Sequence, residues 1–307
     1  MLAAHGFAGY VLLTTARALE TAPVLRQGAE AVLEVPSGAV PEAAAAVRAE
    51  VGHRSLVALG GGRVIDSAKA IAGADGLPCA AVPTTLSGAE MTPFHRMPAG
   101  VDLFNLVRPR LVISVPGLMA SQPPPKLAAS AMNALAHAIE ALYTPLASPV
   151  TELAALRAVE LIGRALAPQA ATREDVALGA LLAGYASGSA GFAVHHAVCQ
   201  TIVRLAGTPH AETNAVMLPH FVRMMEPRAP DEIAAVASAL GVAERADAAR
   251  RVSELAARAG VVRLSDLGFE REMIPGVVAA VTAHPALGNT PDPPGEAELR
   301  NVLEGAL

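Results

Sequence analysis

The hydrophobic pattern of this chain changes at a single proline run, Gln122-Pro123-Pro124-Pro125. Before the run, short apolar segments typical of buried strands alternate with segments of helical periodicity. After it, the periodicity is helical almost throughout. Strands separated by helices form a mostly parallel sheet with helices on both faces. We therefore predict an α/β domain at residues 1–116 and an all-α domain at residues 117–307.

The predicted elements follow this division. Strands are expected at residues 9–13, 31–35, 56–59, 79–82 and 111–115. Helices of the first domain are expected at 41–51 and 66–72. Helices of the second domain are expected at 126–143, 149–167, 173–191, 192–205, 211–226, 230–240, 245–259 and 270–283, with a last short helix in 295–307.

The composition excludes several classes of partner. Hydrophobic residues make up 52% of the 307 residues, which is enough for a sizeable core, and the net charge of -5 leaves no basic surface for nucleic acid. No uninterrupted apolar stretch is long enough to span a bilayer. The two cysteines, Cys79 and Cys199, are far apart and fit reduced thiols. We therefore expect a cytoplasmic protein that binds neither nucleic acid nor a membrane.

A glycine run follows the third expected strand and precedes a helix. Gly60, Gly61 and Gly62 stand at this junction, and Asp66 and Lys69 follow in the helix. Glycines there let backbone N–H groups approach a pyrophosphate closely, with the helix N-terminus behind them. A tight strand-to-helix turn also needs glycine, so the run alone is a weak signal.

The fourth expected strand ends in a second polar turn that contains Thr84, Thr85 and Ser87. The carboxyl ends of neighbouring parallel strands are where such sheets bind nucleotides. Together the two turns favour nucleotide binding over a purely structural role.

Four polar residues in the helical half form the second candidate site. Asn133 and His137 are four residues apart, which places them on one helical face, and His196 and His210 follow later in the chain. An aspartate with three histidines would be typical of a divalent metal site. Here the first position holds a neutral amide, which is a weaker ligand, so both a metal site and a metal-free site are open at this point.

A family resemblance is carried by five segments in chain order, GGGRVIDSAKAIA, PTTLSGAEMTP, MNALAHAIEALY, HHAVCQTI and GTPHAETNAVMLPH. Together they resemble the iron-containing alcohol dehydrogenase superfamily, from about residue 8 to the C-terminus, and within it they are most similar to the maleylacetate reductases. The resemblance implies a Rossmann-like α/β domain and an all-α domain, an architecture similar to that of dehydroquinate synthase, with the active site in the cleft between them. It also implies NADH or NADPH as cofactor and a homodimer.

The resemblance assigns roles on the cofactor side. Gly60, Gly61 and Gly62 match the family's pyrophosphate loop, and Asp66 and Lys69 match the helix that follows it. The second nucleotide loop is matched by Thr84, Thr85 and Ser87.

On the substrate side, Asn133, His137, His196 and His210 match the four ligands of the metal-dependent members. Maleylacetate reductases typically carry Asn at the first position and work without a metal. The resemblance therefore implies a small carboxylate substrate and no metal. We expect His196 or His137 to donate a proton, with Asn133 and His210 orienting the substrate.

The chain departs from the family pattern in several places. It begins late, without the strand region that usually precedes the first dinucleotide-binding strand. Arg63 stands where the glycine loop usually continues with Ser, and Asp102 replaces an expected Lys. Two alternatives therefore stay open, a metal-dependent alcohol dehydrogenase and a non-redox homologue that acts in a specialised pathway.

Three neighbours of the candidate site receive structural interpretations. Glu140 is expected to be a helix-face charge or a partner behind the ligand positions. His195 is expected to be packed or at the rim of a cleft, and Cys199 to be a buried apolar residue.

Overall fold

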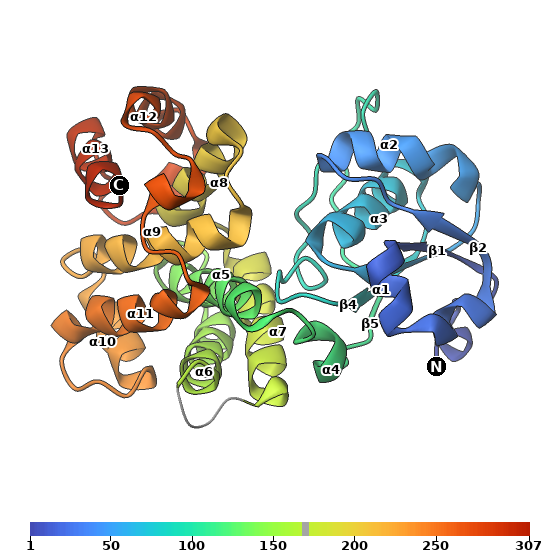
Figure 1. Cartoon of the computed structure of the whole chain (residues 1–307), viewed down its shortest axis with the longest axis horizontal. Coiled ribbons are helices and arrows are strands. Elements are labelled where there is room, and N and C mark those ends of the chain that lie inside the picture. Colours follow the sequence, from blue (N-terminus) through green and yellow to red (C-terminus); the bar gives the residue numbers. More distant parts are fainter. Residues whose placement is uncertain (168–171) are drawn as a thin grey trace. The chain divides into compact units, whose positions relative to one another are not determined.

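The computed structural model describes residues 1–167 and 172–307, which form two compact units, Met1–Ser121 and Gln122–Leu307. The first contains a sheet with helices and the second contains helices only (Figure 1). The predicted fold class is confirmed. The predicted boundary at residues 116–117 lies at the start of the short helix α4 (Pro116–Met119), just before this division.

The first unit is built on a parallel sheet of five strands in the order β2-β1-β3-β4-β5. Its strands are β1 (Tyr10–Thr14), β2 (Ala29–Glu34), β3 (Leu56–Gly60), β4 (Cys79–Pro83) and β5 (Leu111–Val112). The chain reverses its direction of winding between β1 and β3, so the carboxyl end of β3 lies at the switch point of a doubly wound sheet.

The alternating side chains of the strands divide between two apolar layers. Val11, Leu56 and Ala58 belong to a cluster shared with helices α2 (Val40–Val51) and α3 (Gly62–Asp75). The intervening strand residues join α1 (Ala16–Thr21) in the opposite layer. Because side chains point to alternate faces of a strand, a continuous apolar run in each strand buries both faces of the sheet.

The second unit is organised around α5 (Pro124–Tyr143), in which every residue from Ala128 to Tyr143 is buried. Eight further helices complete the part of this unit that the structure describes. They are α6 (Pro149–Ala165), α7 (Arg173–Ala190), α8 (Val194–Ala206), α9 (His210–Met225), α10 (Pro230–Ala239), α11 (Ala248–Ala256), α12 (Ile274–Thr282) and α13 (Glu296–Gly305). The many alanines of α5 let neighbouring helices approach closely, and α6, α7 and α9 all pack on it.

The turn between β3 and α3 has no room for side chains. A Cβ on Gly60 would lie 2.7 Å from Val64, and one on Gly61 would lie 2.8 Å from Cγ2 of Thr85. A Cβ on Gly62 would lie 3.2 Å from Oγ of Ser87. The close packing of the β4 turn therefore favours glycine at positions 61 and 62, and the packing of Val64 from α3 favours it at position 60.

Lys69 is fully buried on α3 and ties the chain that follows β4 to this helix. Its ammonium donates to the carbonyl oxygens of Ala89 at 2.8 Å, Thr92 at 3.1 Å and Phe94 at 2.7 Å, and it pairs with Asp66 at 2.8 Å. A buried cation is tolerated only when it is paired and hydrogen-bonded. These contacts fix the 89–94 segment.

Most predicted elements are confirmed, and the differences are local. Helix α3 begins at Gly62 and not at residue 66, because Gly61 already serves as its N-cap. The predicted helix 192–205 begins two residues later, after a break at Gly191, whose φ of 82° lies in the left-handed region that glycine tolerates. The helix predicted at 245–259 is the shorter α11 flanked by 3₁₀ turns, and α1 and α4 were not predicted.

Within the described residues, no single helix combines the length and apolar character needed to cross a membrane. Only α7 and α8 taken together meet that length and composition, and a bend of 100° separates them.

Replacement of the buried lysine tests the anchor of the 89–94 segment. We expect Lys69→Met to lower the free energy of unfolding by about 3 kcal/mol, because three carbonyl oxygens and Asp66 lose their donor. Lys126→Met is the matched control, since Lys126 is the other lysine and is largely exposed, and it should cost less than about 1 kcal/mol. Equal stabilities of the two variants in chemical denaturation would contradict the anchoring role.

Close packing at the glycine turn gives a second prediction. Gly61→Ala should destabilise the protein by about 1–3 kcal/mol, because its Cβ meets the methyl group of Thr85. Thr85→Ser removes that methyl, so the double variant should recover more than half of the loss in a double-mutant cycle. Strictly additive effects in thermal or chemical unfolding would show that the two side chains do not compete for this space.

Candidate functional site

The predicted nucleotide turns lie together at the carboxyl ends of β3 and β4. The backbone N–H of Thr84 donates to the carbonyl oxygen of Gly60 at 3.0 Å. The N-terminus of α3 has no side-chain cap, so its first N–H groups are left for another acceptor. Oγ1 of Thr85 is buried and has no hydrogen-bond partner among the described residues. A helix N-terminus of this kind suits a phosphate group.

The charged residues predicted near these turns have different surroundings. The ammonium of Lys69 is fully buried and donates its hydrogen bonds to backbone carbonyl oxygens of the 89–94 segment. It therefore stabilises this segment and is not accessible to a ligand. Asp66 is its ion-pair partner, and burial raises the pKa of Asp66 while Lys69 opposes the shift. Arg63 is exposed at the second residue of α3, and Asp102 is exposed in an irregular segment.

Glu90 is a buried carboxyl group in the same region that the sequence reasoning did not single out. It is 1% exposed, and neither carboxyl oxygen has a hydrogen-bond partner among the described residues. Burial raises its pKa to about 7. In the sequence, Glu90 is marked only as an acid just after the second nucleotide turn, within the 89–94 segment that Lys69 anchors.

In the helical unit, α5 and α8 bring the predicted imidazoles together. Asn133 and His137 lie one turn apart on α5, and both are buried. The ring of His137 stacks on the ring of His196 with centroids 4.5 Å apart and an angle of 20° between the planes. Phe192 stacks on His196 at 4.7 Å, so the His196 ring has aromatic neighbours that restrict its rotation.

Glu140 completes this face of α5, because it follows Asn133 by seven residues and His137 by three. Its Oε2 lies 2.5 Å from Nδ1 of His196, and its Oε1 accepts from the backbone N–H of His196 at 3.3 Å. Burial raises the pKa of Glu140, and the backbone N–H groups of Ala193, His195 and His196 oppose this shift. Of the two expectations for Glu140, the structure therefore favours the buried partner of a site histidine over the helix-face charge.

His210 begins α9 and joins the cluster from a third helix. Nδ2 of Asn214 donates to the carbonyl oxygen of His210 at 2.8 Å and lies 3.4 Å from its Nε2. Oδ1 of the same amide lies 2.9 Å from Nε2 of His195. His195 is 1% exposed and packs edge-on against Phe221, so it is the packed histidine that was predicted.

The imidazoles of the cluster share a shift toward the neutral form. Burial lowers the pKa of His137 well below its ordinary value, and the neighbouring His196 and His210 lower it further. Burial lowers the pKa of His196 in the same way. The side chain of His210 is more exposed, yet the protein around it also lowers its pKa, against the effect of Glu212. At neutral pH these rings are uncharged.

Three polar atoms of the cluster are buried without a hydrogen-bond partner among the described residues. They are Oδ1 of Asn133, Nδ1 of His137 and Nε2 of His196. A buried polar atom without a partner is costly, and such atoms are typical of positions where a ligand binds. Asn133, His137 and His196 therefore form the centre of the candidate site, and His210 lies at its margin.

The donor set fits a metal ion poorly. Among residues 1–167 and 172–307, no group of three or more His, Cys, Asp or Glu side chains could hold a metal. The rings of His137 and His196 are nearly parallel and stacked, so their nitrogen lone pairs do not converge on one point. A metal ion shared by two imidazoles needs both nitrogens about 2.1 Å away, with both lone pairs directed at it.

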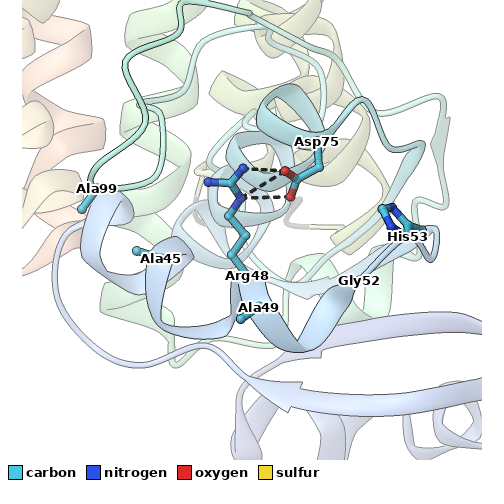
Figure 2. Close-up of a pocket in the computed structure, with 7 residues that line it drawn as sticks. All are labelled: Ala45, Arg48, Ala49, Gly52, His53, Asp75 and Ala99. Atoms are coloured by element: carbon cyan, nitrogen blue, oxygen red, sulfur yellow. Dashed lines mark hydrogen bonds and ion pairs between the residues drawn. The ribbon is translucent and has the colours of Figure 1, made fainter.

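A hollow on the first unit lies apart from all predicted site residues. It is lined by residues of α2 and its neighbours, including Arg48, His53 and Asp75 (Figure 2). Arg48 and Asp75 form a two-pronged ion pair there, with distances of 2.5 to 3.1 Å. Because each charge is already neutralised by the other, this hollow is a weaker candidate than the buried cluster.

Two residues of the candidate site were not found from the sequence. Phe192 stands in the break between α7 and α8, and Asn214 lies one turn into α9. The signal for Asn214 was its spacing of four from His210. Phe192 gave no signal, because its stacking on His196 depends on the 100° bend between the two helices.

Comparisons with known proteins address the family. The model of the Fe-containing alcohol dehydrogenase family, C-terminal, matches residues 127–307, and that of iron-containing alcohol dehydrogenase matches residues 14–98. The chain is 34% identical to maleylacetate reductase of Sphingobium indicum over 83% of its length and 75% of the relative. It is 38% identical to maleylacetate reductase of Burkholderia cepacia over 73% of its length and 66% of the relative.

A solved structure gives the same result. The chain resembles maleylacetate reductase from Rhizobium sp. with a TM-score of 0.85 and 28% identity, over 100% of this chain and 91% of that one. The predicted resemblance and the predicted enzyme class, an oxidoreductase, are confirmed. The chain belongs to the iron-containing alcohol dehydrogenase family, and within it is most similar to the maleylacetate reductases.

Proposed function

We propose that the protein reduces a small unsaturated or keto acid with two carboxylates, such as maleylacetate, using NADH or NADPH and no metal. The observation that carries this proposal is the buried cluster of Asn133, His137 and His196. Its three unpartnered polar atoms belong to neutral groups, which suits hydrogen bonding to a substrate oxygen.

The glycine turn supports the cofactor part of the proposal. Gly61 and Gly62 are partly exposed in this turn, and the N-terminus of α3 begins there without a side-chain cap. These N–H groups would hold the pyrophosphate of a dinucleotide. The hydroxyl of Thr85, which has no described partner, would add a hydrogen bond on the same side.

The reaction needs a hydride and a proton, and this chain's residues handle the proton. When bound, the reduced nicotinamide supplies the hydride to the carbon–carbon double bond. Negative charge then develops on the conjugated keto oxygen. The imidazole of His137 or His196 would donate a hydrogen bond and a proton to this charge, while the amide of Asn133 and the ring of His210 would orient the substrate.

The amide at position 133 also affects which substrates the site accepts. A carboxylate there would repel a dianionic acid, whereas Asn133 does not. The neutral amide of Asn133 also supports metal independence. Without a carboxylate, and with the rings of His137 and His196 stacked, the site should bind a divalent ion weakly.

A metal-dependent alcohol dehydrogenase is the second candidate, and one observation favours it. Metal-ligating histidines usually donate their second ring N–H to a carboxylate, and Glu140 holds His196 in this way. In that case Nε2 of His196 would be the ligand atom.

Assays with and without metal separate these candidates. We expect maleylacetate-dependent oxidation of NADH or NADPH to persist after dialysis against a chelator, with substoichiometric metal by elemental analysis. Asn133→Asp is the matched variant, and it should bind a divalent ion more tightly and turn over the dianionic acid more slowly, because it adds a negative charge. Stoichiometric metal with activity lost on chelation would favour the alcohol dehydrogenase. Failure to bind either nicotinamide cofactor would leave only the non-redox alternative.

Substitution of the imidazoles tests their role in proton transfer. We expect His196→Gln or His137→Gln to lower kcat at least about a hundredfold for whichever ring donates the proton, with little change in the KM for the cofactor. His220→Gln is the control, since His220 lies on α9 outside the cluster and its loss should leave kcat close to wild type. Near-normal kcat in both cluster variants would refute proton donation by these rings.

A further inference from the structure

The structure points to Glu140 as the positioning residue of the candidate site. We propose that its carboxylate fixes His196 in the tautomer with the hydrogen on Nδ1, so that Nε2 is the atom that exchanges a proton with the substrate. This inference rests on the proposed function, in which an imidazole of the cluster handles a proton.

The first argument is the set of groups around the carboxylate. Glu140 is 1% exposed, its Oε1 accepts from the backbone N–H of His196 at 3.3 Å, and its Oε2 lies 2.5 Å from Nδ1 of His196. The nearby backbone N–H groups of Ala193 and His195 also favour its charged form. The three backbone N–H groups can only donate. Burial raises the pKa of Glu140, but these donors oppose that shift and favour the carboxylate, so at the 2.5 Å contact Glu140 accepts and Nδ1 of His196 carries the hydrogen.

The second argument is the origin of these donors. They belong to the first turn of α8, whose own N-cap residue, Ala193, gives no side-chain cap. The N–H of Val194 donates instead to Oγ1 of Thr290 at 3.0 Å. Glu140 and Thr290 therefore satisfy the N–H groups that a helix start leaves unpaired, and the positive end of the helix stabilises the carboxylate.

The third argument is the restriction of the His196 ring. His137 stacks on it at 4.5 Å and Phe192 at 4.7 Å. Rotation that would exchange the two nitrogens must disturb both contacts and break the short bond to Glu140. With Nδ1 held, Nε2 is left buried without a partner among the described residues.

The proton chemistry follows from this arrangement. A neutral His196 with its hydrogen on Nδ1 presents a lone pair at Nε2, so it first takes a proton from solvent water, and the adjacent carboxylate stabilises the resulting imidazolium against the lowering of its pKa by burial. The same atom then gives the proton to the substrate when negative charge develops on it. Glu140 itself touches no substrate, so its contribution is through the orientation and the basicity of His196.

Glu140→Gln tests the proposal. An amide has one acceptor oxygen, which cannot accept from both the backbone N–H groups at the start of α8 and the Nδ1–H of His196. The backbone N–H groups would keep the amide oxygen, which turns the NH₂ group toward Nδ1 of His196 and requires Nδ1 to accept. We expect ¹⁵N imidazole NMR to show His196 as the Nδ1–H form in the wild type and as the Nε2–H form in the variant. The resonances of His196 are assigned by their loss in His196→Gln.

Kinetics give the second readout. Glu140→Gln should lower kcat at least about a hundredfold, with the KM for NADH or NADPH changed less than about threefold. Glu140→Asp keeps the charge and should retain the Nδ1–H form and part of the activity. Glu152→Gln, an exposed acid in the first turn of α6, should change neither readout.

Two results would overturn the positioning role. One is an Nε2–H form of His196 in the wild type. The other is a folded Glu140→Gln protein with an unchanged tautomer and near-normal kcat, which would leave Glu140 as a helix cap alone. If Glu140→Gln does not fold, the wild-type and Glu140→Asp spectra decide. If no acid is reduced with either cofactor, the proposed function fails, and the tautomers still decide the role of Glu140.

Discussion

The contact between Glu140 and the start of α8 is the interaction on which the helical site depends. Burying a carboxylate costs several kcal/mol unless its oxygens are hydrogen-bonded, and here the backbone of α8 supplies the donors. Those N–H groups would themselves be unpaired at a helix start without a capping side chain. Each partner therefore offsets part of the other's desolvation cost, and the contact places His196 directly over α5.

The α/β unit relies on a buried charge of the opposite sign. Lys69 is surrounded by carbonyl oxygens of the 89–94 segment and by Asp66, which together replace the water that an ammonium needs. The segment follows the turn that carries Thr84, Thr85 and Ser87. The sequence predicted Lys69 as a cofactor-binding residue. In the structure it instead holds the backbone that follows the second nucleotide turn at the carboxyl end of β4.

The sequence was sufficient to predict most helices and strands and the members of the cluster, but not the residues that contact them. Strand and helix positions follow from periodicity, and the spacing of Asn133, His137 and Glu140 on one helical face follows from helix geometry alone. The stacking of Phe192 on His196 does not, because it depends on the bend after Gly191. Nor does the burial of Lys69, since the segment whose carbonyl groups surround it lies twenty or more residues away. Local patterns carry no information about contacts made across such distances.

The amide at position 133 and the carboxylate at position 140 are linked by electrostatics. Both side chains are buried on one face of α5, and the single negative charge there is already balanced by the N–H groups of α8. An aspartate at position 133 would add a second buried anion for which no spare donor is described, at a cost of several kcal/mol unless a cation joined it. A neutral residue removes that requirement. Under the proposed function, the exchange of carboxylate for amide would let the site remain stable without a metal ion and accept a dianionic acid.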